Sequence, residues 1–431
     1  MLSILRNSWP LFLGMMLLQV GNGMQGTVVG VRGDIEGFSA QQLSFIMSAY
    51  FLGFLGGATY APRLIRNVGH VRVFAALASF ISAALILYAA VPNLYAWFLI
   101  RVLLGFCFSG VYVVAESWLN DAAENETRGQ ALSVYMIVQM VGVVSAQYLL
   151  NVADASGYTL FIIMSVLVSV SFAPILLSVA PAPMFQMTRP MSFRQLVEVS
   201  PLGVVAMLLV GVIYSAMFTM SSVYGTERDL TIAQITSFAA SFYIGGLILQ
   251  YPIGFVSDRM DRRVLIVLLT GCCAAITFLG IPFTGSFSIL LILAFIIGGV
   301  ANPLYSLVIA YTNDFLEHED MAAASGGLVF VTGLGAIFGP IVLGPLMARF
   351  GPDAFFGFLG GLMAAIALYG VYRSTVRAAP SVEDTSSYAY VSPTATSVAI
   401  EVAQEVAIDM ALEAEEEAGN EDPNDAGRDS D

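Results

Sequence analysis

The sequence predicts an all-α membrane protein with twelve transmembrane helices, arranged as two parallel repeats of six, and with cytoplasmic N and C termini. Three observations lead to this fold class. The 431 residues are 58% hydrophobic and only 11% charged, against roughly 25% charged in an average soluble domain. Apolar stretches of membrane-spanning length follow one another along the chain, and the second half repeats chemistry of the first. Lipid must therefore be the main solvent.

The predicted spans fill most of the chain. A helix needs about 20 mostly apolar residues to cross the hydrocarbon core. The very short linkers 91–93 and 284–286 require the helices on either side to run antiparallel. The first span lacks a signal-peptide cleavage pattern and is followed by others, so we expect it to stay as an anchor. The twelve predicted spans are 10–31, 42–62, 71–91, 94–118, 129–151, 157–179, 201–222, 232–256, 263–283, 287–311, 323–348 and 353–373.

The arginines predict the orientation of these spans. Twelve arginines fall in loops on one side, whereas only Arg32, Arg228 and Arg349 fall on the other. Such an excess is typical of the cytoplasmic side. We therefore expect both termini and the central linker in the cytoplasm, in a multi-pass protein of a bacterial inner membrane.

An internal repeat divides the chain. At an offset of 193 residues, segments 40–53 and 233–246 are identical at seven of fourteen positions, and Asp121 falls on Asp314. Parallel repeats are typical of secondary transporters, which place a solute site between the halves near the midplane. The predicted domains are a six-helix half at 1–180, a cytoplasmic linker at 181–200, a second six-helix half at 201–376, and an acidic, mostly disordered cytoplasmic tail at 377–431.

Three motifs resemble those of a known family. Residues 254–263, in a predicted cytoplasmic loop, resemble the G-x-x-x-D-R-x-G-R-R motif of the Major Facilitator Superfamily, with Asp261 in place of the second Gly. Residues 101–105 resemble its R-x-x-x-G motif, and residues 335–340 resemble its G-x-x-x-G-P motif. Residues 116–120 and 62–72 look like a poorly characterised bacterial branch.

The resemblance covers residues 1 to about 376. It implies a secondary transporter that moves a small-molecule substrate by alternating access across the lipid bilayer. It also implies a monomer. We expect that it is not an enzyme, because the predicted spans hold no His or Asp pairs near the midplane and no metal-ligand cluster, and we expect neither a cofactor nor a nucleic-acid partner. A receptor or sensor that retains the fold without transport is the alternative.

The first-half loop departs from the family pattern. When Gly69 is aligned with the second Gly of the motif, Arg66 stands where the family has Asp. We therefore expect an asymmetric cytoplasmic gate, in which Glu116 pairs with Arg63, Arg66 or Arg128. Plain topology-setting charge is the alternative. The gate candidates are Glu116, Asp121, Arg128, Arg63, Arg66, Asp258, Arg259 and Arg262.

Arg101 is the sharpest single candidate for a binding site. It lies about seven residues inside its predicted helix, where a charge costs about 2.5–3.5 kcal/mol on insertion scales and should face a cavity or the bundle interior. It favours an anionic or zwitterionic solute, whereas the aromatic and Met-rich helices would also suit an amphipathic compound. Asn22 and Gln25 share a face of a glycine-rich helix segment.

The full set of cavity candidates consists of polar groups within predicted spans. Each could instead form an interhelical hydrogen bond. The candidates are Arg101, Asn22, Gln25, Gln139, Tyr214, Gln250, Asn302 and Tyr305.

Groups for proton or metal chemistry are sparse. No carboxylate lies at the centre of a span, so a proton relay through Glu116, or through Asp34 and Glu36, stays an open hypothesis. His70 and His318 lie in predicted cytoplasmic loops. The three cysteines have no spacing typical of a metal site or a disulfide framework, and we expect no metal.

The tail holds most of the charge. Residues 380–431 contain fourteen Asp or Glu and one Arg, which gives −13 of the net −14. Such a composition favours a solvated tail. Val398, Val402, Val406 and Met410 nevertheless repeat every four residues. This spacing is typical of an amphipathic helix, so a docked helix or a partner protein is the alternative.

Overall fold

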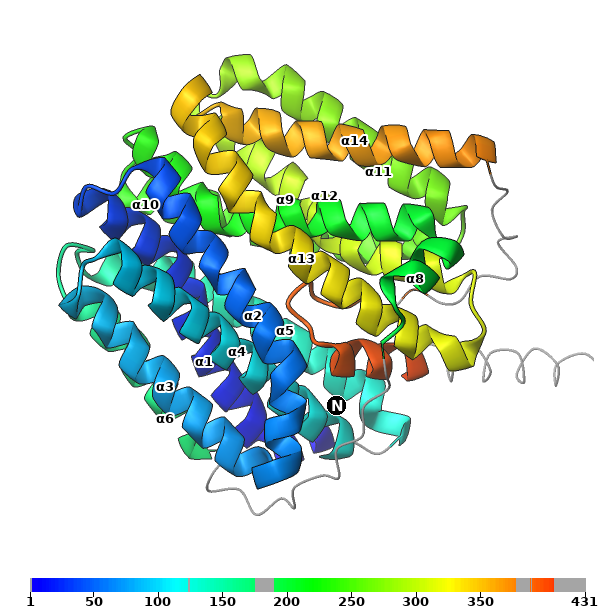
Figure 1. Cartoon of the computed structure of the whole chain (residues 1–431), viewed down its shortest axis with the longest axis horizontal. Coiled ribbons are helices and arrows are strands. Elements are labelled where there is room, and N and C mark those ends of the chain that lie inside the picture. Colours follow the sequence, from blue (N-terminus) through cyan, green and yellow to red (C-terminus); the bar gives the residue numbers. More distant parts are fainter. Residues whose placement is uncertain (1, 123–124, 175–189, 377–387, 389, 407–431) are drawn as a thin grey trace, which may run out of the picture.

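A computed structural model describes residues 2–122, 125–174, 190–376, 388 and 390–406. Two groups of helices lie side by side in Figure 1, and the tail runs between them. The first half consists of α1 (Leu2–Ile35), α2 (Ala40–Val68), α3 (His70–Ala90), α4 (Leu94–Ala122), α5 (Asn125–Leu149) and α6 (Thr159–Ser171), with a short turn η1 (Leu150–Val152).

The second half follows a short helix, α8 (Phe193–Val199), which packs beside α13. It consists of α9 (Pro201–Glu227), α10 (Ile232–Ser257), α11 (Arg262–Gly280), α12 (Phe287–Asn313), α13 (His318–Phe350) and α14 (Ala354–Val376), with a turn η2 (Ile281–Phe283).

The helices have the length and apolarity of membrane spans. Within the described residues, ten helices qualify, namely α2 to α5 and α9 to α14. The predicted span 10–31 lies in α1, whose polar segment around Asn22 lowers its hydropathy, and α6 covers the described apolar part of span 157–179. Large apolar side chains such as Leu99, Leu279 and Leu368 project outward, as expected where lipid is the solvent.

The pattern of helix packing follows a twofold pseudo-symmetry. In the first half α1 packs on α5 and α2 on α4, and in the second half α9 packs on α13 and α10 on α12. Between the halves, α2 packs on α13, α5 on α10 and α1 on α9. Exchanging the halves turns the α2–α13 contact into the α10–α5 contact and leaves the α1–α9 contact unchanged. This is the arrangement of two parallel repeats.

Glycines bring the paired helices into backbone contact. A Cβ on Gly105 of α4 would overlap the carbonyl oxygen of Tyr50 on α2. At the equivalent place in the second half, a Cβ on Gly298 of α12 would overlap the carbonyl oxygen of Phe242 on α10. Small residues allow this approach, which drives helix association in lipid through van der Waals packing.

The repeat has two registers. Gly105 and Gly298 are 193 residues apart, as the sequence match predicts. Along α2 and α10, however, the equivalent positions are 192 apart, because Gly53 meets the carbonyl of Val102 as Gly245 meets that of Phe295. The capping boxes that begin α2 and α10, on Ser39 and Thr231, are also 192 apart. The offset of 193 residues found in the sequence therefore misaligns α2 and α10 by one residue.

The halves are packed together directly at one end of the bundle. At this end Asn151 donates to Thr236 Oγ1 over 3.2 Å. A Cβ on Gly30 of α1 would overlap Ser222 of α9, and a Cβ on Gly344 of α13 would overlap Ser44 of α2. We call this the direct-contact end.

At the other end the tail lies between the halves. Its described residues contact the ends of α4 and α10 and the beginnings of α5 and α13. Residues 397–406 form a helix, which is drawn in red between the two halves in Figure 1. We call this the tail end. The sequence favours a solvated tail, whereas residues 390–406 are docked, and Val398 and Val402 of the predicted amphipathic helix are buried. Met410 lies outside the described residues.

The glycine contacts give a test of the fold. Replacing Gly298→Ala should destabilise the protein by about 1–3 kcal/mol, because the added methyl group has no space against the α10 backbone. Gly361→Ala is the matched control, since nothing lies within 4 Å of a Cβ there. Thermal unfolding in detergent should show a lower Tm for the first variant only. Equal Tm values would contradict the close α10–α12 contact.

Candidate functional site

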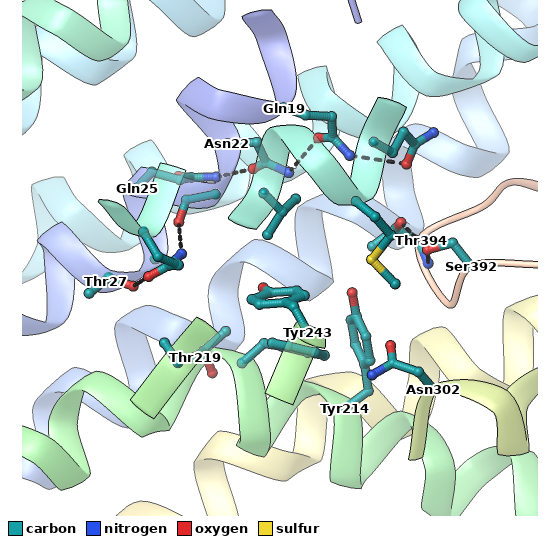
Figure 2. A pocket seen from close by; sticks show the side chains of 18 of the residues that line it. Gln19, Asn22, Gln25, Thr27, Tyr214, Thr219, Tyr243, Asn302, Ser392 and Thr394 are labelled. Carbon is teal, nitrogen blue, oxygen red and sulfur yellow. Dashed lines mark hydrogen bonds between the residues drawn. The ribbon is translucent and has the colours of Figure 1, made fainter. Parts of the chain in front are cut away.

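A polar cavity lies between the two halves. Figure 2 shows it from close by, with α1 of the first half above and side chains of the second half below. It measures ≈ 100 Å³, several times the ~10–15 Å³ that one water needs. Its polar lining residues are Gln19, Asn22, Gln25, Thr27, Arg101, Gln139, Gln147, Tyr214, Thr219, Tyr243, Asn302, Ser392 and Thr394.

One face of α1 supplies a row of amides. Gln19, Asn22 and Gln25 are three residues apart, which puts them on the same side of the helix. Gln25 donates to Asn22 Oδ1 over 2.6 Å, and Asn22 donates to the Tyr112 hydroxyl over 2.6 Å. Tyr112 in turn donates to Gln19 Oε1 over 2.6 Å, and Gln19 donates to Gln139 Oε1 over 3.0 Å. The amides form one continuous chain of hydrogen bonds along the cavity wall.

Arg101 stands at one end of this chain. Its guanidinium donates to Gln25 Oε1 over 3.1 Å and contacts the Met47 sulfur at 2.7 Å, a weak acceptor. Its Nε has no hydrogen-bond partner, although the residue is only 2% exposed. Among the described residues no carboxylate pairs with it. A buried charge without a counter-charge is costly unless something else compensates it.

The second half contributes an aromatic wall. Phe218 stacks on Tyr243 with ring centroids 4.1 Å apart, and Tyr214 packs edge-on against Phe218 at 4.5 Å. In Figure 2, Asn302 lies beside Tyr214 at the cavity wall. It is 1% exposed, and its side chain donates to the Gly298 carbonyl over 2.9 Å. The cavity thus offers amides and one cation from the first half, and aromatic rings, two of them with hydroxyl groups, together with the amide Asn302 from the second half.

The structure brings most of the predicted cavity residues together. Arg101, Asn22, Gln25, Gln139, Tyr214 and Asn302 all line the cavity, whereas Gln250 and Tyr305 do not. Tyr305 is buried elsewhere in the α12 packing, and Gln250 is half-buried on α10. Polarity within a span therefore does not by itself predict whether a side chain faces the cavity, because it does not specify the helix face.

Several lining residues escaped the sequence interpretation. Gln19 continues the three-residue spacing of Asn22 and Gln25, so extending that pattern by one step would have found it. Gln147, which accepts from Thr27 over 3.0 Å, follows no such pattern. The tail residues Ser392 and Thr394 lie far outside the predicted spans, and no sequence signal placed them at the cavity.

The gate candidates of the second half form a charged cluster at the tail end. Arg262 is buried and forms an ion pair with Asp314 and a longer one, at 3.5 Å, with Asp258. Asp314 is the repeat equivalent of Asp121, so the offset could have identified this partner. Arg259 is exposed and packs over the Phe255 ring, with the guanidinium carbon 3.6 Å from the centroid. Arg259 therefore stands apart from the cluster.

The gate candidates of the first half are arranged differently from the prediction. Glu116 is buried and accepts from Tyr135 over 3.3 Å and from Thr396 of the tail, because the docked tail supplies donors that the sequence did not suggest. Arg128 pairs with Glu405 of the tail at 2.7 Å.

Two other first-half candidates do not contact Glu116 or Arg128. Arg63 and Arg66 are exposed, and the side chain of Asp121 is outside the described residues. His70, expected in a loop, is buried at the start of α3 and bonds Ser117 at 3.1 Å.

Comparison with known proteins gives a family match. The model of the Major Facilitator Superfamily matches residues 11–241 and 202–400. An uncharacterised MFS-type transporter of Yersinia pestis (strain Pestoides F) is 23% identical over 366 residues, covering 82% of this chain and 92% of the relative.

Solved transporters share the fold. A mutant of the nucleoside transporter NupG superposes with a TM-score of 0.71 at 14% identity, over 85% of this chain and 99% of that one. A D-xylose-proton symporter superposes with a TM-score of 0.65 at 13% identity, over 88% of this chain and 98% of that one. At such identities the likeness concerns the fold alone.

The buried ion pair at the tail end gives a second test. Asp314→Asn should destabilise the protein by about 3–5 kcal/mol, because it removes the closer acid from a buried arginine. Asp258→Asn should cost much less, since Asp258 is partly exposed and 3.5 Å from Arg262. Thermal unfolding of both variants measures the difference. A lower Tm for Asp258→Asn than for Asp314→Asn would contradict this assignment.

Proposed function

Because this chain belongs to the Major Facilitator Superfamily, we propose that it is a secondary transporter that moves a small solute across the membrane by alternating access. Members of this superfamily are multi-pass membrane transporters and not enzymes. The mechanism, the orientation and the solute belong to the proposal.

The shared cavity is the observation that carries the proposal. Both halves contribute polar groups to one space, so rocking one half against the other would expose that space to alternate sides. The cavity is complete within one chain, which supports a functional monomer. The arginine excess supports twelve spans with both termini in the cytoplasm of a bacterial inner membrane. The tail end is then the cytoplasmic end.

The lining favours a polar solute that carries an anionic group. Arg101 is buried without a carboxylate partner among the described residues, and its Nε is unsatisfied. A carboxylate or phosphate on the solute would supply both the missing charge and a hydrogen-bond acceptor. Amides of α1 would bind further polar groups, and the Phe218–Tyr243 stack would cover an apolar or ring portion. The candidates that line the cavity are proposed as the solute ligands on this basis.

A ligand screen with two Arg101 variants tests this proposal. A ligand at 100 times its Kd should stabilise the folded protein by about 2.7 kcal/mol. We expect organic anions to raise the Tm of the parent and to have no effect on Arg101→Gln, which lacks the charge. Arg101→Lys is the matched control, because it retains the charge without the planar fork. It should show a reduced but measurable shift.

Flux measurements separate the transporter from its alternative. The compound found in the screen should exchange across proteoliposomes that contain the parent protein. Binding without any exchange would favour the receptor or sensor. Stabilisation by neutral compounds alone, unaffected by Arg101→Gln, would contradict the anionic solute while leaving transport itself to the flux assay.

The proposal also includes proton coupling, with Glu116 as the residue that carries the proton. This carboxylate is buried in α4 at the tail end, within reach of the space between the halves. We expect Glu116→Gln to remove the pH dependence of uptake of the compound found in the screen. Thr396→Val is the control, because it alters the same contact but keeps the carboxylate. Unchanged pH-dependent uptake by Glu116→Gln would exclude Glu116 as the proton carrier.

A further inference from the structure

The tail contains an uncharged stretch within its acidic sequence. Residues 385–400 carry no charged side chain, whereas acids precede the stretch at Glu383 and Asp384 and follow it from Glu401 onward. The docked residues include most of this stretch. Val391, Ala395, Ala399 and Ile400 are each at most 2% exposed, which is the burial of a core and not of a surface tail.

The docked tail is bound to the first half through α4 and α5. Thr396 donates its backbone N–H to Glu116 Oε2 over 3.0 Å and its hydroxyl to the same oxygen. Arg128 pairs with Glu405 at 2.7 Å. Next to this pair, the position of a Cβ on Gly129 lies 3.6 Å from Val406 Cβ. The tail helix therefore lies directly against the start of α5.

The same segment is bound to the second half through α10, α12 and α13. The Tyr388 N–H donates to Asp258 Oδ1 over 2.8 Å. Ser306 and Val391 exchange two hydrogen bonds of 2.9 Å, one in each direction between the hydroxyl and the backbone. Gln404 donates to the Ser325 hydroxyl. The tail thus connects the two halves at the end where they would have to move relative to each other.

The segment also reaches the cavity. Ser392 and Thr394 belong to its lining, and Figure 2 shows them on the tail ribbon at its edge. We propose that residues 388 and 390–406 form a built-in plug, which binds between the halves at the cytoplasmic end and closes the cavity against solute. This inference rests on the proposed function, because a plug matters only where solute passes.

Two consequences follow from the contacts. Solute can enter or leave through the tail end only after the segment has withdrawn, because Ser392 and Thr394 of the segment line the cavity on that side. The halves can also separate at this end only when the segment loses its contacts to one of them, either those to Glu116 and Arg128 or those to Asp258, Ser306 and Ser325. The plug therefore opposes both access and rocking, and any factor that removes it activates the protein.

A disulfide tests the docking itself. The Cβ separation of 3.6 Å between positions 129 and 406 falls within the range for disulfides. In a background with the native cysteines replaced by serine, the pair Gly129→Cys and Val406→Cys should cross-link under mild oxidation. Each single substitution is the control for adducts between molecules. Absence of an intramolecular cross-link, measured by peptide mass spectrometry, would overturn the proposal.

The accessibility of the cavity tests the plugging. Thr219→Cys places a thiol on the cavity wall in the same background, and a charged methanethiosulfonate reports its exposure in purified full-length protein. Ala399 of the tail is buried and lines one small pocket together with Glu116. Ala399→Glu adds a second carboxylate there and should displace the tail. We expect labelling about tenfold faster, the ratio that about 1.4 kcal/mol of lost docking energy produces. Ala399→Ser is the matched control and should label like the parent.

A second variant that should displace the tail is needed in case Ala399→Glu fails to fold. The pair Thr396→Val and Ser306→Ala adds no bulk or charge and removes the Thr396 hydroxyl bond to the first half and the two Ser306–Val391 bonds to the second half. It should also accelerate labelling. Equal labelling rates in the parent and in the folded displaced variant would overturn the plug. Because labelling requires no solute, this outcome is distinct from a failure of the proposed transport, which the flux assay measures.

Discussion

The need to satisfy buried polar groups without water governs this structure. A bundle with lipid outside must pair its internal donors and acceptors with one another. The α1 amides do so by forming a chain from Arg101 to Gln139. Arg262 does so with Asp314, and Glu116 does so with the tail. Arg101 lines the cavity with its Nε unsatisfied and with no carboxylate partner among the described residues, and this combination is what points to a ligand.

The repeat explains why two halves of different sequence have the same shape. Gly105 and Gly298 permit the same backbone approach in each half, so the α2–α4 and α10–α12 pairs have equivalent geometry. The side chains that face the cavity are free to differ. The first half presents amides and an arginine there, whereas the second presents Tyr214, Phe218 and Tyr243. Symmetric packing thus supports an asymmetric binding surface.

Much of the fold could be predicted from the sequence. The length and apolarity of the spans follow from local composition, and the repeat follows from comparing the two halves of the sequence. Arg101, Asn22 and Gln25 could be found since a polar group deep in a span must face inward. Gln250 shows the limit, because polarity does not specify the helix face. The docking of Thr396 on Glu116 could not be predicted, since it joins residues 280 positions apart. The high negative charge of the whole tail also predicted a solvated segment, although residues 385–400 within it carry no charge.

The covalent attachment of the tail has a quantitative consequence. Only the residues between Val376, where α14 ends, and Tyr388 separate the docked segment from the bundle. A short tether of this kind holds its end at an effective concentration on the order of millimolar. A free solute or peptide competing for the same space would have to reach a comparable concentration, weighted by its affinity. For the proposed plug, the tether would therefore set the competitor concentration at which the segment is half displaced from between the halves.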